Sequence, residues 1–218
     1  MLKSIRFLLF VAFLFVACLC FSQKPSKTKP STTKPSPAKS SEIDVEHSTI
    51  TVHVLRAGVF GFTGDNHEVQ APIARGKLDE AAKTIEFEIE TAKMQVLDPK
   101  MEPAKRAQVQ EKMLGPEVLN TAQYPLIQFT STSVASGRIG QWSVTGNLKL
   151  HGQTHPVVVQ VSQPADEAAL ANSRTKGHHY RGTATLKQTD FGIKPVSVAG
   201  GTVKVKDELK LDFEIVTR

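Results

Sequence analysis

The sequence has few cysteines and few aromatic residues, and acidic residues are missing from its N-terminal part. Its 218 residues include two cysteines, Cys18 and Cys20, and both lie within the first 22 positions. If that stretch is removed as a leader, the remaining chain has no disulfide, no thiol nucleophile and no cysteine ligand for a metal. Disulfide-stapled folds, cysteine hydrolases and zinc–cysteine sites are therefore excluded for the remaining chain.

No aspartate or glutamate occurs in the first 41 positions, which hold seven of the 27 Lys and Arg residues. The other 20 basic residues face 21 acidic residues in positions 42–218, which gives that part a net charge of −1. The formal charge of +6 thus arises from the N-terminal segment and not from the part that is long enough to fold. Because nucleic-acid binding requires a basic surface on the folded part, we expect no nucleic-acid partner.

Residues 1–22 have the parts of a secretory signal peptide. Lys3 and Arg6 supply the positive start, an apolar run of 15 residues follows at positions 7–21, and small residues end the segment. Such a run is shorter than the about 17–25 residues that span a bilayer. We therefore predict an exported protein that is periplasmic or extracellular.

Two features of the N-terminal part leave alternatives open. Val16-Ala17-Cys18 partly fits a lipoprotein site, so anchoring at Cys18 is a variant of the export prediction. Residues 23–41 are rich in Pro, Ser, Thr and Lys and have no large apolar side chain, which predicts a disordered linker. The lysines of this linker either remain solvated or make peripheral contact with anionic lipid headgroups.

From position 42 to position 218 the apolar residues mostly recur with the period of two that marks β-strands. Only residues 104–114, behind Pro103, change to a helical pattern, and their apolar stripe is narrow enough to predict a short outer helix. Long alternating strands without a βαβ rhythm predict an all-β domain, an extended eight-stranded antiparallel β-barrel. The alternating runs lie at 43–54, 69–78 (interrupted by Pro72), 85–89, 127–134, 142–150, 157–161, 180–186 and 203–215, and the polar residues 151–155 predict a hairpin turn.

The usual motifs of enzymes are missing from the sequence: there is no nucleophile elbow, no His-Glu-x-x-His, no P-loop and no dinucleotide fingerprint. Glu86, Glu88 and Glu90 share the solvent side of a predicted strand, where carboxylates keep the surface soluble. Histidines lie near predicted turns, and three that converge could bind zinc, but their spacing does not favour it. We predict no catalysis, no cofactor and no metal, with a small hydrolase or a metal-dependent enzyme as the weakest alternative. The histidines concerned are His67, His151, His155, His178 and His179.

The large side chains on the inward positions of the predicted barrel have two interpretations. They fill a dry interior, which would make the domain a structural or stress-response interaction module without a ligand. Alternatively they line a tunnel for an apolar chain, in which each buried CH₂ group contributes about 0.8 kcal/mol. Strand periodicity is the same in both cases. The candidate lining residues are Phe60, Phe62, Phe87, Ile89, Phe129, Trp142, Leu148, Leu150, Tyr180, Phe191 and Phe213.

Five segments of the chain resemble a known family in order and spacing. They are Ile43-Asp44 with His47-Ser48, Phe60-Gly61-Phe62, Tyr124-Pro125 leading into 129–134, Gly-Asn-Leu-Lys-Leu-His-Gly-Gln-Thr at 146–154, and Gln-Thr-Asp-Phe-Gly-Ile at 188–193. Together, over about residues 42–216, they resemble the YceI-like polyisoprenoid-binding family. The resemblance implies a lipocalin-like barrel, an export signal and a central tunnel that holds a polyisoprenoid or another long-chain amphiphilic lipid.

The resemblance also implies a function without catalysis. We expect the domain at 42–218 to bind, transport or sequester an isoprenoid or long-chain lipid ligand in the barrel interior. The polar residues His67, Tyr180 and Arg181 are candidates to orient the head group of that ligand. A homodimer is compatible with the sequence.

Overall fold

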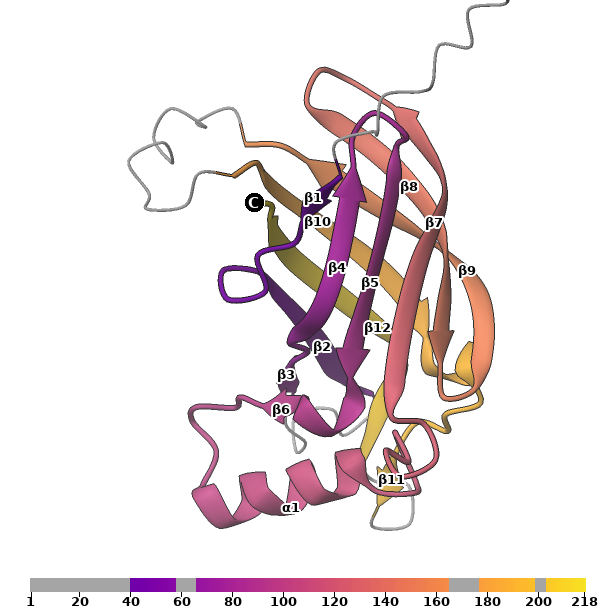
Figure 1. Cartoon of the computed structure of the whole chain (residues 1–218). Helices are drawn as coiled ribbons and strands as arrows, with labels where there is room; N and C mark the ends of the chain where they lie inside the picture. Colours follow the sequence, from indigo (N-terminus) through magenta and orange to yellow (C-terminus); the bar gives the residue numbers. More distant parts are fainter. Residues whose placement is uncertain (1–39, 58–65, 165–176, 199–202) are drawn as a thin grey trace, which may run out of the picture. The chain divides into compact units, whose positions relative to one another are not determined.

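The computed structural model describes residues 40–57, 66–164, 177–198 and 203–218. These residues form an antiparallel sheet that curls around one interior, with one α-helix below it in Figure 1. The predicted signal peptide, all but the last two residues of the predicted linker, and Phe60 and Phe62 lie outside the described residues. Within the described ranges, no helix combines the length and the hydrophobicity that a bilayer-spanning segment needs.

The described sheet contains eight strands of seven or more residues and four shorter ones. The long strands are β2 (Thr49–Ala57), β4 (Ile73–Asp79), β5 (Thr84–Glu90), β7 (Leu126–Ser136), β8 (Gln141–Leu150), β9 (Gln153–Ser162), β10 (His179–Lys187) and β12 (Val203–Val216). The short strands are β1 (Ser41–Glu42), β3 (His67–Gln70), β6 (Gln95–Val96) and β11 (Ser197–Val198).

The prediction of an antiparallel all-β fold with one helix is confirmed, but the number of strands is larger than the predicted eight. Two predicted strands are divided. The run 69–78 breaks into β3 and β4 at Pro72, because proline has no backbone N–H to donate to a neighbouring strand. The run 43–54 is divided by a turn at residues 45–47, so that Ile43 forms only an isolated bridge with Thr217 and the strand β2 begins at Thr49.

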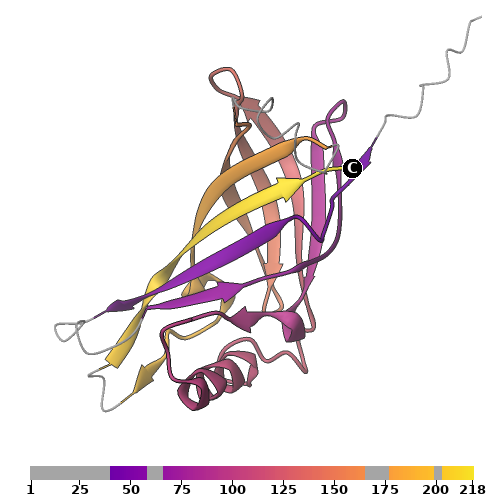
Figure 2. The same cartoon turned by 90° about the vertical axis from the view of Figure 1, so that its left-hand side faces the viewer.

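The order of neighbouring strands explains why the sheet curls. Along the sheet the order is β1-β4-β5-β7-β8-β9-β10-β12-β2-β3-β6. β3 and β4 are separated by only Ala71 and Pro72 in the chain, yet they stand near opposite ends of this order. The continuous chain from β3 to β4 therefore brings the two ends of the sheet together. Figure 2 shows the side where β12, in yellow, lies between β10 and β2.

The two ends of the barrel are built differently. One end carries the β4–β5 and β7–β8 hairpins, and we call it the hairpin end (Figure 1). There residues 41–44 lie between β4 and the end of β12: Ser41 pairs with Leu78, and the Asp44 N–H donates to the Val216 carbonyl at 2.7 Å. The other end carries α1 (Pro103–Leu114), and we call it the helix end.

Irregular segments close the helix end. Glu102 caps α1 by accepting hydrogen bonds from the N–H groups of Ala104 and Lys105, and Pro103 occupies the first helical turn. The Gln110 side chain ties the helix to β6, since it accepts from the Val96 N–H at 2.7 Å and donates to the Met94 carbonyl at 2.8 Å. The short 3₁₀ helices η1 (Thr91–Lys93) and η2 (Gln188–Phe191) also lie at this end. They bring buried side chains between the strand ends, among them Thr91 and Phe191.

The β8–β9 hairpin has a tighter turn than the predicted one. Leu150 pairs with Gln153, so the turn consists of His151 and Gly152, with φ of 50° and 75°. Two successive positive φ values are typical of a type I′ turn, whose twist fits the flanking strands. The ring of His151 lies 4.4 Å from the ring of Tyr124, measured between centroids. The prediction that the turn extends to His155 is wrong, because that residue already pairs with Leu148 in the strand.

Candidate functional site

The barrel interior contains a cavity of about 230 Å³. All eight long strands contribute to its wall, because the residues of one parity on each strand point inward. Most of these side chains are aliphatic or aromatic, and the rings of Phe87 and Phe129 stack at 5.2 Å in the wall. The aliphatic and small wall residues are Ile43, Ile50, Leu78, Ile85, Val134, Val144, Leu148, Val157, Val159, Val161, Ala184, Leu186, Leu211 and Ile215.

The cavity lies toward the hairpin end, since residues of the β4–β5 hairpin belong to its wall. Several inward side chains there, such as Trp142, Tyr180 and Leu211, are only partly buried. At the helix end the inward side chains are packed more tightly, and Phe191 is 1% exposed. The interior is therefore filled at one end and hollow toward the other.

A small group of polar side chains surrounds the cavity where it reaches the hairpin end, and we call this group the mouth. It consists of Asp79, Glu80, Lys83, Thr84 and Tyr180. The Tyr180 hydroxyl donates to Glu80 Oε1 at 2.7 Å, and the Trp142 ring meets the Tyr180 ring edge-on with centroids 6.1 Å apart. An apolar interior with a polar mouth matches the two parts of an amphiphilic molecule.

Six of the predicted lining residues belong to the cavity wall: Phe87, Phe129, Trp142, Leu148, Tyr180 and Phe213. Ile89, Leu150 and Phe191 belong instead to the buried core and are not among the described wall residues. Parity could not separate these two sets, because core and wall residues occupy the same face of the strands. Whether any of these residues contacts a ligand stays a prediction.

The sequence-based list omitted the smaller wall residues, such as Val157 and Val159. The sequence did indicate that they point inward. They pair with Gly146 and Val144, which lie on the same face of β8 as Trp142. Only the preference for large side chains left them out of the list.

The structure places the three candidate head-group residues in different regions. Tyr180 lies at the mouth. Arg181 follows it on the strand and points to the outer face, where it pairs with Glu214 at 3.2 Å. His67 lies on β3, and its Nδ1 is 2.6 Å from Oδ2 of the buried Asp98. Of the three, only Tyr180 belongs to the described cavity wall.

The described histidines do not converge on one site. His67 pairs with Asp98, whereas His151 lies 3.2 Å from the Phe191 carbonyl oxygen. His178 lies 3.8 Å from Glu80 at the mouth. The partners of these side chains are thus different and lie on different elements.

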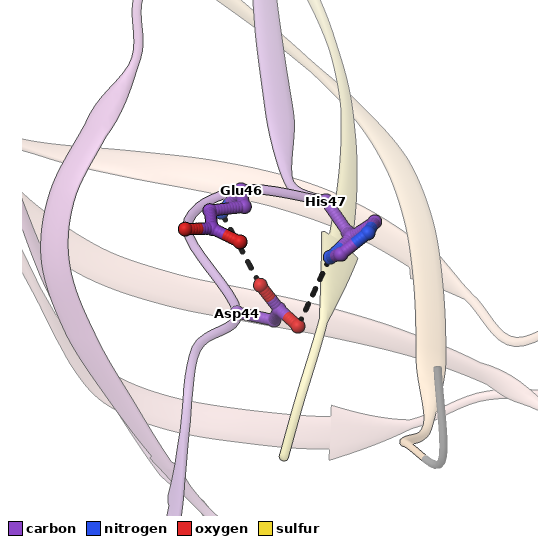
Figure 3. A group of neighbouring side chains, drawn as sticks. All are labelled: Asp44, Glu46 and His47. Atoms are coloured by element: carbon purple, nitrogen blue, oxygen red, sulfur yellow. Dashed lines mark hydrogen bonds and ion pairs between the residues drawn. The ribbon is translucent and has the colours of Figure 1, made fainter. Parts of the chain in front are cut away.

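One group of potential metal ligands occurs among the described residues, formed by Asp44, Glu46 and His47 (Figure 3). Asp44 is buried, and its oxygens already accept from Arg218 at 2.9 Å and from the Glu46 backbone at 3.2 Å, with His47 Nδ1 at 3.1 Å. The Arg218 side chain, followed by His47, holds the pKa of Asp44 well below its usual range. A cation would have to displace these partners, so the group is better explained as a tie between Asp44 and Arg218, which lie far apart in the sequence.

Comparison with known proteins shows the family to which this chain is related. A family model described as a YceI-like domain matches residues 42–217. A UPF0312 protein of Pseudomonas savastanoi pv. phaseolicola is 33% identical over 102 residues, which are 47% of this chain and 50% of that protein. A UPF0312 protein of Shewanella sp. strain W3-18-1 is 25% identical over 154 residues, 70% of this chain and 75% of the relative. The chain thus spans about half the length of the first of these curated relatives.

The crystal structure of Burkholderia cenocepacia BcnA has the same fold, with a TM-score of 0.60 at 17% identity, over 81% of this chain and 99% of BcnA. This likeness agrees with the curled antiparallel sheet derived from the strand pairing. Since the family model covers almost all of the chain beyond its N-terminal segment, the chain belongs to the YceI-like domain family.

Proposed function

We propose that the protein binds a polyisoprenoid or another long-chain amphiphilic lipid in its barrel and carries or sequesters it without catalysis. The observation that carries this proposal is the apolar cavity of about 230 Å³ to which all eight long strands contribute. Membership of the YceI-like family supports it, because that fold is consistent with a hydrophobic ligand.

The wall and the mouth would act on different parts of the ligand. Each CH₂ group that moves from water into the apolar cavity contributes about 0.8 kcal/mol, so affinity should grow with the length of chain that is enclosed. The hydrogen-bonded pair of Tyr180 and Glu80 at the mouth offers a polar contact to a hydroxyl or similar head group. A lipid would then enter with its tail first and keep its head near the β4–β5 hairpin.

Export is part of the proposal. The sequence of residues 1–22 supports secretion to the periplasm or the extracellular space, with anchoring at Cys18 as the alternative. The basic residues in positions 23–41 would hold the barrel near anionic lipids, where its ligand is found. A carrier is useful in such a compartment, because an apolar lipid must otherwise cross it through water.

Trp142 provides a direct test, because it is the one tryptophan of the sequence and belongs to the cavity wall. Titration of the purified full chain with farnesol should shift the emission of Trp142 to shorter wavelength in a saturable way. The Val159→Phe variant, which fills part of the cavity, should weaken binding about tenfold or more. Ala135→Phe adds a phenyl ring at an exposed position of β7 and should leave binding unchanged.

Native mass spectrometry of freshly purified protein complements this titration by detecting co-purified lipid. The proposal is wrong if farnesol and longer prenols leave the Trp142 emission unchanged and no lipid co-purifies. A saturable shift that Val159→Phe and Ala135→Phe reduce equally would also contradict it, since binding would then not take place in the cavity.

A further inference from the structure

Strands β9 and β10 are neighbours in the sheet, but they pair over only part of their lengths. The pairs run from Ser162 with Arg181 to Val159 with Ala184, four in all. Both strands continue beyond this point toward the helix end. If the register continued, Val158 would pair with Thr185, but the described pairing stops one residue earlier.

The sequence of β9 limits how far the pairing could continue. In a hairpin with a two-residue turn, the residues that flank the turn form a hydrogen-bonded pair, and such pairs then alternate along the strands. Leu150 and Gln153 flank the turn, so the backbone groups of Pro156 and Val158 face away from β8 and toward β10. Proline has no N–H, so Pro156 cannot donate to β10. The edge of β9 that faces β10 is thus poorly suited to continue the pairing.

A space of about 390 Å³ lies where the two strands separate, and we call it the side window. Residues of the last two pairs of β9 and β10 contribute to its wall. The wall also includes His155 and Phe191, whose rings meet edge-on at 5.3 Å. Polar residues such as Thr183 and Asp190 alternate with apolar ones around it. Val158, which is 51% exposed, adds an apolar surface beside the window.

The side window and the cavity have part of their walls in common. Val157, Ala184, Thr185 and Leu186 line both. Val157 and Leu186 are only partly buried, as expected for side chains between two spaces. By contrast, the straight path along the barrel axis is blocked, because the core residues of the helix end, such as Ile89 and Phe191, are buried and packed together.

We propose that the side window is a second opening of the cavity, through which the distal part of a long lipid chain passes between β9 and β10 to the outer surface. This inference rests on the proposed function and extends it. A chain that enters at the mouth meets the packed core at the helix end and turns sideways across Val157 and Leu186. The site therefore accepts lipid chains that are longer than the cavity. The tail of the bound lipid itself occupies the side window.

Photolabelling locates that tail. The full chain is loaded with a solanesol analogue that carries a diazirine at the end remote from the hydroxyl, irradiated and digested for mass spectrometry. We expect labels on residues that line the window and not the cavity, such as Val158, Thr183 and Asp190. The corresponding farnesol analogue, which is shorter, should label only interior residues. Labels from the long analogue at the mouth, at Glu80 or Lys83, or only in the interior would overturn the proposal.

A pair of variants tests the same point through affinity. Val158→Trp places a large ring at the window, on a residue that lines the window but is not among the described wall residues of the cavity, whereas Lys210→Trp places the same ring on an exposed residue of β12, on the other side of β10. Val158→Trp should weaken solanesol binding about tenfold and leave farnesol binding within about twofold. Lys210→Trp should change neither. Equal effects on both prenols, or no effect on solanesol, would show that long chains do not use the window.

The two proposals can fail separately. If neither prenol binds the wild-type chain, the proposed lipid binding is wrong. If both bind, but the long-chain label does not appear at the window and Val158→Trp does not weaken solanesol binding, only the second opening is wrong.

Discussion

The helix end and the hairpin end of the barrel are built from the same alternating strands, yet one is packed and the other is hollow. At the helix end, side chains from outside the long strands, such as Met94, Leu119 and Phe191, enter the core and are buried. At the hairpin end, the β4–β5 and β7–β8 connections are hairpins, and the β4–β5 hairpin contributes polar residues to the mouth. Connections between strands, more than the strands themselves, thus decide whether a barrel of this kind holds a cavity.

The sharpest test of this difference compares two phenylalanines. Phe191→Ala removes a ring that is 1% exposed at the helix end, and it should lower the free energy of unfolding by about 3–5 kcal/mol. Phe213→Ala removes a partly buried ring from the cavity wall, where the lost contacts are fewer, and should cost about 1–2 kcal/mol. Urea denaturation followed by circular dichroism measures both. Equal losses would mean that the cavity wall is as tightly packed as the core.

The opposite change, from small to large, should distinguish the two regions as well. Ala71 is 2% exposed at the bend between β3 and β4, so Ala71→Leu overpacks the core and should destabilise the fold by about 1–3 kcal/mol. Ala184 belongs to the cavity wall, and Ala184→Leu can extend into free space. We expect its unfolding free energy to stay within about 0.5 kcal/mol of wild type. A large loss for Ala184→Leu would contradict a hollow interior at this point.

Much of this fold could be predicted from the sequence, because alternation identifies the strands and their inward faces. The run 142–161 gave the β8–β9 hairpin, and Pro103 marked the start of α1. Alternation could not show that Leu150 is core while Leu148 also lines a cavity, since that difference depends on segments far away in sequence. The role of Pro156 depends on the register of its hairpin, and the exact turn, His151-Gly152, was shorter than predicted.

A third comparison concerns the tie at the hairpin end. The pKa of Asp44 lies below its ordinary value of 3.8 in the folded chain, mainly because Arg218 donates to it. A depressed pKa in the folded state means that this ion pair stabilises the fold above about pH 4 and that the contribution is lost as the pH falls below that value. Arg218→Gln should therefore lower the free energy of unfolding at pH 7, and its difference from wild type should be smaller near pH 3.

The matched control for Arg218→Gln is Arg181→Gln. Arg181 pairs with Glu214 at 3.2 Å, and its side chain is about as exposed as that of Arg218. Its partner Glu214, however, is much more exposed than the buried Asp44, so the removal of Arg181 should cost less than about 0.5 kcal/mol at either pH. Denaturation curves of both variants at pH 7 and near pH 3 measure the two losses in the free energy of unfolding. The tie at Asp44 has no special role if the two variants lose the same stability at pH 7.

The smallest effect on stability is expected at the mouth. Tyr180→Phe removes the hydroxyl that donates to Glu80 at 2.7 Å, and because this pair is exposed to solvent, the free energy of unfolding should change by less than about 0.5 kcal/mol. Its effect on binding should depend on the ligand: farnesol, which has a hydroxyl head, should lose a few-fold in affinity, while farnesane, the hydrocarbon without it, should not. The Trp142 ring, 6.1 Å from that of Tyr180, reports both titrations. If the variant weakens both ligands equally, Tyr180 acts through its ring in the apolar wall, and the head group of the lipid is recognised elsewhere.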